Sequence, residues 1–166
     1  MQSITSLTFL FLLFCLSANS QEKTFDFKAQ VFYEREPLKE ATIEIYEAGD
    51  LVFETQTKGN GKFDFELEAE RQYHVEVSHE NARTKVIWIN TKGTKNLKVK
   101  VPTFGFDVYL EEEEITKFDE LSEIPVTLIK YQPKKEEFYM DKTYGEVIKS
   151  QRQKIKDNSL DLRRVK

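Results

Sequence analysis

Residues 57–77 place the strongest constraint on the fold of this chain, because apolar and polar residues alternate along most of this segment. The apolar members of the alternation are Phe63, Phe65, Leu67, Tyr73, Val75 and Val77. A period of two gives each strand one apolar face and one wet face. Gly59-Asn60-Gly61 tolerates positive φ and predicts a chain reversal before the first strand. We therefore expect a pair of strands here, joined through residues 69–71, whose apolar face a second sheet covers.

The same alternation recurs on both sides of this segment. The further strands that it predicts are residues 25–34, 41–47, 51–57, 84–90, 97–101 and 104–110. Residues 84–90 are apolar on both faces, as expected of a central strand, and Trp88 between two isoleucines is expected in the core. Lys98 and Lys100 predict that the strand at 97–101 faces solvent. Seven or eight short strands indicate an all-β fold, an antiparallel Greek-key sandwich.

Three stretches resemble the carboxypeptidase-regulatory-like domain: PLKEATIEI at 37–45, TKGNGKF at 57–63 and YHVEV at 73–77. The resemblance extends over about residues 25–111 and implies a transthyretin-like (prealbumin-like) sandwich. Lys58 stands where that family often has Asp, and Arg35-Glu36 where it often has Gly. The family module is an accessory to a catalytic domain, so the resemblance implies a fold and no peptidase activity. Residues from 104 onward also resemble the tails of small uncharacterised envelope proteins with this domain.

The N-terminus has the pattern of a signal peptide. Residues 7–16 are an apolar run that is too short to span a bilayer, and Ala18-x-Ser20 suits cleavage before Gln21. Cys15 follows Leu13-Phe14 rather than the small residues of a lipoprotein signal. We therefore expect export to the periplasm or cell surface of a Gram-negative-type envelope, without a transmembrane segment or a disulfide in the mature chain.

Beyond Leu110 the sequence changes character. Residues 111–123 hold seven acidic residues and one lysine, and residues 124–140 indicate a β-hairpin. Thr143-x-x-Glu146 has the spacing of a capping box, and predicts a helix with an apolar stripe at Tyr144, Val147, Ile148, Gln151 and Ile155. The predicted domains are a signal peptide (1–20), the sandwich (21–111), an acidic linker with hairpin and amphipathic helix (112–156), and a disordered tail (157–166).

The acidic and basic residues of this C-terminal third are segregated. From Lys149 to the end there are seven basic and two acidic residues, opposite in sign to the excess at 111–123. We expect these regions to attract one another, within one molecule or between molecules. The formal net charge of −4 argues against a general nucleic-acid binder, because such a protein needs a basic face.

The sequence assembles no catalytic or metal site that we can identify. His74 and His79 are the only histidines, and neither begins a zinc-hydrolase motif. Residues 111–114 are expected to be a solvated acidic edge rather than a Ca²⁺ site, since no ligand loop surrounds them. Lys28 falls on the polar side of its strand, which argues against an isopeptide bond. The chain also lacks the C-terminal Tyr-Arg-Gly-Ser of the transthyretin-like hydroxyisourate hydrolases, and we predict no enzyme and no cofactor.

The remaining hypothesis is an interaction or structural module of the envelope that binds another envelope protein. The residues expected to form an exposed apolar patch for a partner are Phe138, Tyr139 and Tyr144. The alternative is a glycan- or peptide-binding module that uses the aromatic residues near the C-terminal hairpin.

Overall fold

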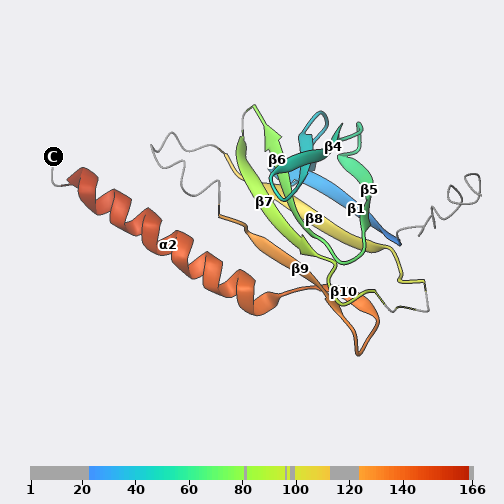
Figure 1. Cartoon of the computed structure of the whole chain (residues 1–166). Helices are drawn as coiled ribbons and strands as arrows, with labels where there is room; N and C mark the ends of the chain where they lie inside the picture. The colour runs from blue at the N-terminus through green and yellow to red at the C-terminus, as the bar shows by residue number, and fades with distance from the viewer. Residues whose placement is uncertain (1–22, 81, 96, 98–99, 113–123, 165–166) are drawn as a thin grey trace, which may run out of the picture.

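The computed structural model describes residues 23–80, 82–95, 97, 100–112 and 124–164, with side chains described up to residue 155. The expected signal peptide and residues 113–123 of the acidic segment lie outside these ranges. The described chain is an all-β sandwich of two mostly antiparallel sheets, and a single helix, α2 (Lys142–Arg164), follows the last strand (Figure 1). No helix in the described part of the chain is long and apolar enough to cross a membrane.

The smaller sheet is built around its first strand. Its members are β1 (Thr24–Tyr33), β2 (Glu36–Pro37), β5 (Lys62–Glu68) and β8 (Phe104–Leu110). β1 runs antiparallel to β5, with Phe27 opposite Phe65, and parallel to β8, with Phe27 opposite Phe104. The parallel pairing departs from the purely antiparallel sandwich that the sequence predicted. It brings the last strand of the predicted sandwich beside the first, although the two are far apart along the chain.

The larger sheet has six strands in the order β10-β9-β7-β6-β3-β4. Their bounds are β3 (Thr42–Glu47), β4 (Asp50–Gln56), β6 (Gln72–His79), β7 (Ala82–Asn90), β9 (Thr127–Gln132) and β10 (Glu137–Met140). β9 and β10 form the expected hairpin, with Phe138 opposite Tyr131. β9 also pairs with β7 in parallel, and the Val126 N–H donates to the Val86 carbonyl at 2.8 Å. The hairpin therefore extends the larger sheet.

The expected pairing of the two strands in residues 57–77 is wrong. β5 lies in the smaller sheet and β6 in the larger one, so their apolar faces meet across the core. The short connection between them is fixed by Thr91, which is fully buried: its hydroxyl donates to the Glu68 carbonyl at 2.8 Å and accepts from the Arg71 N–H at 2.9 Å. The expected glycine turn is present, because Gly61 has φ +72° and an added Cβ there would lie 2.6 Å from the Val31 carbonyl oxygen.

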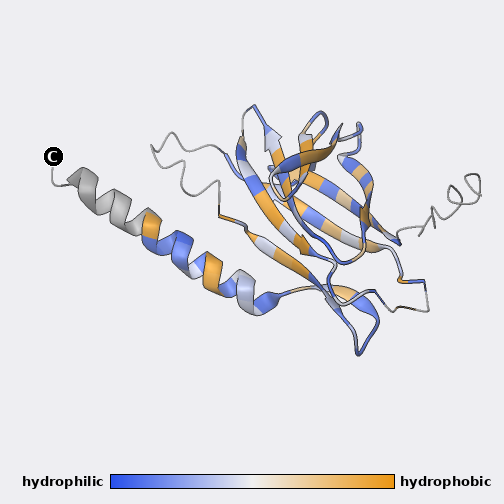
Figure 2. Cartoon of the chain, in the orientation of Figure 1, coloured by the Kyte–Doolittle hydropathy of each residue, from blue (hydrophilic) through white to orange (hydrophobic). Residues whose placement is uncertain are grey.

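The core lies between the sheets, and the alternation of hydropathy along the strands is visible in Figure 2. Inward residues predicted from the period of two are confirmed as buried: Phe25, Phe27, Ala29, Val31, Ala41, Ile43, Ile45, Phe63, Phe65, Leu67, Tyr73, Val75 and Val77. The ring of Phe27, which has no exposed surface, lies 5.3 Å from that of Phe65 in its own sheet and 5.0 Å from that of Phe138 in the other. Aromatic rings from both sheets therefore join the two layers.

Three expectations for the second half of the chain are wrong. The described residues 97, 100 and 101 are not in the predicted strand, although Val101, on its predicted apolar side, is buried. The cap of α2 is Asp141, whose Oδ1 accepts from the Tyr144 N–H at 3.1 Å, and Thr143 lies inside the helix. The helix also continues to Arg164, through most of the tail that the sequence predicted to be disordered. Asp is preferred over Thr as an N-cap, and its negative charge suits the helix N-terminus; the pair with Lys130 holds this carboxylate in place.

Removing the ring of Phe138 tests whether the hairpin belongs to the core. Phe138 is 5% exposed, while its neighbour Tyr139 is half-buried on the other face of the strand. Because a cavity would form against Phe25 and Phe27, Phe138→Ala should lower the free energy of unfolding by about 3–5 kcal/mol in urea denaturation. Tyr139→Ala, the matched control, should cost less than about 1.5 kcal/mol. Equal losses for the two variants would show that the hairpin does not pack as described.

Candidate functional site

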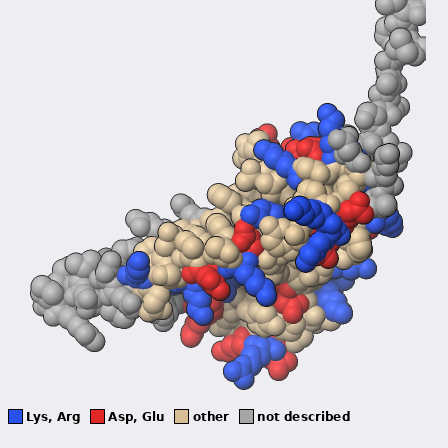
Figure 3. Space-filling model, turned by 90° about the horizontal axis from the view of Figure 1, so that it is seen from below, with Lys and Arg blue, Asp and Glu red and all other residues tan. Residues whose placement is uncertain are grey.

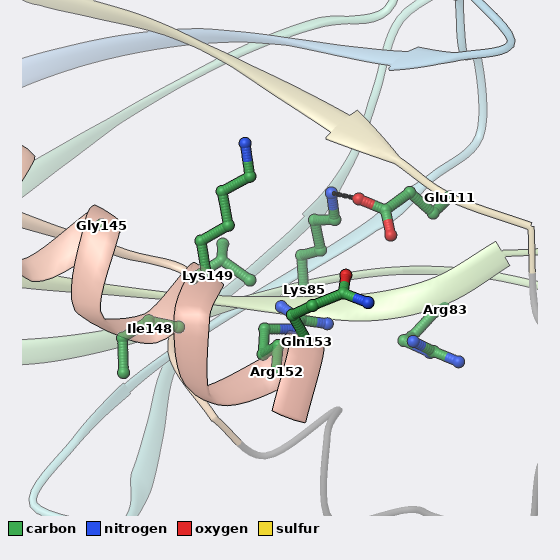
Figure 4. A pocket seen from close by; sticks show the side chains of 9 residues that line it. Arg83, Lys85, Glu111, Gly145, Ile148, Lys149, Arg152 and Gln153 are labelled. Carbon is green, nitrogen blue, oxygen red and sulfur yellow. Dashed lines mark hydrogen bonds and ion pairs between the residues drawn. The ribbon is translucent and has the colours of Figure 1, made fainter. Parts of the chain in front are cut away.

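A basic pocket lies where β7, the end of β8 and α2 meet (Figure 4). Its volume is about 320 Å³, and its lining residues are Arg83, Lys85, Glu111, Val126, Gly145, Ile148, Lys149, Arg152 and Gln153. Four of these side chains are cationic and one, that of Glu111, is a carboxylate. We refer to this site as the basic pocket.

The sheet side of the pocket is held by pairing at the end of β8. The Arg83 N–H donates to the Glu111 carbonyl at 2.9 Å, which fixes β7 beside the residue that follows β8. The Lys85 Nζ lies 2.9 Å from Glu111 Oε1, and only 11% of the Lys85 side chain is exposed. A largely buried ammonium needs such a partner, because an isolated charge is costly to remove from water.

The helix side of the pocket is positioned by the first turns of α2. The Asp141 N–H donates to the Leu128 carbonyl, and the Tyr144 hydroxyl donates to the Pro125 carbonyl at 3.1 Å. These bonds hold the start of α2 beside the segment that leads into β9. Ile148, which is buried, and Arg152 are four residues apart and therefore share one face of the helix, which is the face turned to the pocket.

The charges in the pocket interact strongly. The hydrogen bond from Lys85 holds the pKa of the Glu111 carboxyl below its ordinary value of 4.5, and the charges of Arg152 and Arg83 act in the same direction. Burial lowers the pKa of the Arg152 guanidinium, an effect that the charge of Glu111 opposes. Arginine nevertheless stays protonated in proteins. The pocket is therefore positively charged around a carboxylate that stays ionised.

One donor in the pocket is unsatisfied. The Arg152 Nη2 atom is buried and has no hydrogen-bond partner among the described residues. Leaving a buried donor of a charged group unpaired is costly, so an acceptor that enters the pocket would gain this interaction. Neither Arg83 nor Lys149 forms a side-chain ion pair within the described part of the chain. The donor set fits the oxygens of a carboxylate or phosphate.

The basic character is local to the pocket. Figure 3 shows that Lys and Arg are interspersed with Asp and Glu over the face seen from below, rather than gathered into a field of one sign. A long-range basic surface of the kind that binds nucleic acid is not visible on that face.

The structure separates the three predicted partner-binding residues. Phe138 is part of the core, with ring centroids 5.3 Å from Phe25 and 5.5 Å from Tyr131, so it is not a surface contact. Tyr139 and Tyr144 are both partly buried, and Tyr144 anchors α2 through its hydroxyl. The alternation that placed Tyr139 outward necessarily turned Phe138 inward.

Trp88 is the opposite case, since the prediction that it belongs to the core is wrong. Its side chain is 37% exposed on the outer face of β7, while Ile87 and Ile89 point into the sandwich. Val147 on α2 was expected in the apolar stripe and is 51% exposed. Both errors have one cause. The periodicity of apolar residues tells which side chains share a face of a strand or helix, but not whether another part of the protein covers that face.

The two histidines do not meet other reactive groups that would form a metal site. His74 Nε2 lies 2.9 Å from Glu76 Oε1, on the outer face of β6. No cluster of three or more His, Cys, Asp or Glu suited to a metal ion occurs in the ranges that the structure describes. Glu113 and Glu114, two of the residues considered for Ca²⁺, lie outside those ranges, and Lys28 is exposed on β1.

The sequence did not lead us to predict that the residues of the basic pocket form a site. Lys149 and Arg152 belong to the basic C-terminal excess and Glu111 to the acidic segment, whose attraction was predicted. Lys85 is followed in its strand by four apolar residues. This lysine in an otherwise apolar run was the signal in the sequence that could have indicated the pocket.

Comparison with known proteins finds only distant likenesses among solved structures. No family model matches the chain, and no curated protein matches it. Among solved structures, it is similar to catechol 1,2-dioxygenase from Acinetobacter sp. ADP1, with 13% identity, a TM-score of 0.43 and coverage of 58% of this chain and 55% of the enzyme. A DUF3823 family protein from Parabacteroides merdae has 14% identity and a TM-score of 0.36, with coverage of 65% and 49%. The Bacillus anthracis TIE protein has 14% identity and a TM-score of 0.41, with coverage of 54% and 17%.

These similarities correct the prediction that the chain is not an enzyme. The solved structures to which it is similar include catechol, chlorocatechol and hydroxyquinol 1,2-dioxygenases. At 9–13% identity and TM-scores of 0.37–0.43, the likeness assigns no activity to this chain. The resemblance to the carboxypeptidase-regulatory-like domain stays a prediction, because no family model matches the chain.

The pairing of Glu111 predicts a pH-dependent contribution to stability. Because the folded-state pKa of Glu111 is lowered, its contribution is present above the ordinary pKa of 4.5 and is lost as the pH falls through the folded-state pKa. Wild type should be more stable than Glu111→Gln at pH 7, and the difference should shrink progressively as the pH falls below 4.5 in urea denaturation. Glu112→Gln, which removes the neighbouring carboxylate instead, is the control. A wild-type advantage over Glu111→Gln that stays constant down to pH 3 would contradict the ion pair.

Proposed function

We propose that this chain is an exported binding module of the cell envelope, of the carboxypeptidase-regulatory-like kind, which holds an acidic segment of another envelope protein in the basic pocket. The observation that carries the proposal is the buried, unpartnered Arg152 Nη2 beside three further cationic side chains. The N-terminal signal pattern and the resemblance of the tail to envelope proteins support the location.

A carboxylate-bearing peptide suits the pocket for three physical reasons. A guanidinium binds a carboxylate through two parallel N–H···O bonds, and Arg152 has a donor available for this. Lys149 and Arg83 line the pocket and would attract the carboxylates of the peptide. Binding would not require either to break an ion pair with another described residue. The buried Ile148 and the partly buried Val126 supply an apolar wall that excludes water and strengthens these contacts.

The alternative prediction, a glycan or peptide site at the hairpin, has less support from the structure. It depended on Phe138, Tyr139 and Tyr144 as a shared surface, and Phe138 is in the core. Tyr139 alone does not provide an apolar platform.

Binding of fluorescein-labelled hexaglutamate, followed by anisotropy, tests the proposal. We expect saturable binding that weakens as salt is added, and a loss of about tenfold or more in Lys149→Glu, because a reversed charge at the pocket repels the peptide. Lys62→Glu is the matched control, since Lys62 is an exposed lysine on β5 in the opposite sheet. Equal affinity of wild type and Lys149→Glu would contradict the proposed site.

The partner and the compartment need a second measurement. A photo-crosslinking amino acid at position 149 should capture, in intact cells, a protein whose crosslinked peptide is acidic, and the chain should fractionate with the envelope. A cytoplasmic location, or crosslinks confined to peptides without acidic residues, would overturn the proposal. Crosslinks to a second copy of this chain would assign the acidic segment to that copy.

A further inference from the structure

A row of aromatic and apolar side chains crosses the outer face of the larger sheet. The strand register places Tyr46 opposite Leu51 and His74, His74 opposite Trp88, and Trp88 opposite Leu128. Directly paired residues point to the same side of a sheet, and neighbouring strands lie about 4.8 Å apart, so the row is about 19 Å long. We call these five residues the cross-sheet row.

The row is partly open to solvent. Trp88 and Leu51 are exposed, Tyr46, His74 and Leu128 are half-buried, and the Tyr46 and His74 rings lie 5.5 Å apart. The inner face of the same strands packs against the smaller sheet, so these outer rings are not needed to form the core. Aromatic residues that are exposed in a continuous row mark a binding surface more often than isolated ones do.

A shallow hollow lies at the centre of the row. Its volume is about 480 Å³, and Tyr46, Gly49, Gln72, His74 and Trp88 are among its lining residues. This volume falls in the range of about 300–1,000 Å³ that small-ligand sites occupy. The charged groups of its rim are balanced: Arg71 Nη1 lies 3.2 Å from Glu47 Oε1, and Lys92 and Glu70 carry opposite charges.

Polar side chains border the row on both sides. The register places Glu44 opposite Glu76 on one side, and Gln72 opposite Asn90 on the other. Both row-side carboxylates contact the row: Glu76 pairs with His74, and Glu44 accepts a hydrogen bond from the Tyr46 hydroxyl. Apolar ring faces are thus flanked by carboxylate acceptors and amide groups that both donate and accept hydrogen bonds.

We propose that the cross-sheet row binds a neutral oligosaccharide. A sugar ring has C–H groups on its faces and hydroxyl groups around its edge, so Trp88 and Tyr46 would pack on the faces while Gln72, Asn90 and Glu44 hydrogen-bond the hydroxyls. Glu44 and Glu76 disfavour an acidic polymer, and Arg71 and Lys92 disfavour a cationic peptide. The row is separate from the basic pocket, so this proposal does not rest on the proposed function.

Trp88 is the only tryptophan in the chain, so its fluorescence reports on the site directly. The purified full chain would be titrated with cellohexaose, maltohexaose and chitohexaose. Hexalysine, a cationic peptide, would be titrated separately to test the alternative kind of ligand. We expect at least one hexasaccharide to give a saturable emission shift and to protect Trp88 from acrylamide quenching. A response to none of the three, or a saturable response to hexalysine only, would overturn the proposal.

Variants then assign the binding to the row. By calorimetry, Trp88→Ala should weaken the responding sugar about tenfold or more, because the ring supplies most of the apolar contact. Tyr46→Ala keeps the fluorescent reporter and should also weaken binding, which guards against a Trp88→Ala variant that fails to fold. Val147→Ala removes an exposed apolar side chain on α2, away from the row, and should leave affinity unchanged. Unchanged affinity in both row variants would place the sugar elsewhere and end the inference.

Discussion

The packing of Phe27 between the two sheets is the interaction on which the rest of the structure depends. Its ring contacts that of Phe65 in the smaller sheet and that of Phe138 from the C-terminal hairpin in the larger one. The hairpin is thereby fixed to the core, and Asp141, directly after β10, then caps α2. A helix with so narrow an apolar stripe would be marginal alone, so its position is set by this chain of contacts rather than by its own propensity.

The basic pocket is a consequence of that arrangement. One wall comes from β7 and the end of β8, and the other from α2, which reaches this place only because the hairpin directs it there. Lys85 is largely buried and pairs with Glu111, whereas Arg152 is left with a buried donor unsatisfied. Such a group lowers the stability of the free protein, and the structure retains it where a ligand could reach it. In the proposed function, the same few side chains affect both stability and binding.

The alternation of residues predicted the strands and their inward faces well, and the sites poorly. Period two tells which side chains share a face of one strand, so the inward orientation of Phe63 and Val75 was predictable. It does not tell which sheet a strand joins, so β5 and β6 were wrongly paired, and it does not tell what covers a face, so Trp88 was wrongly buried. The pocket unites Lys85 and Arg152, which are distant in sequence, and only the tertiary fold brings them together.

Native-state hydrogen exchange measures most directly whether the C-terminal hairpin is part of the sandwich. β9 lies between β7 and β10, so its amides are bonded on both sides of the strand. Amides of Ile129 and Tyr131 should therefore exchange with the same free energy of opening as that of Val75 in β6, which is the global value. Exchange of the β9 amides at the rate of an unstructured peptide, while Val75 stays protected, would contradict the account.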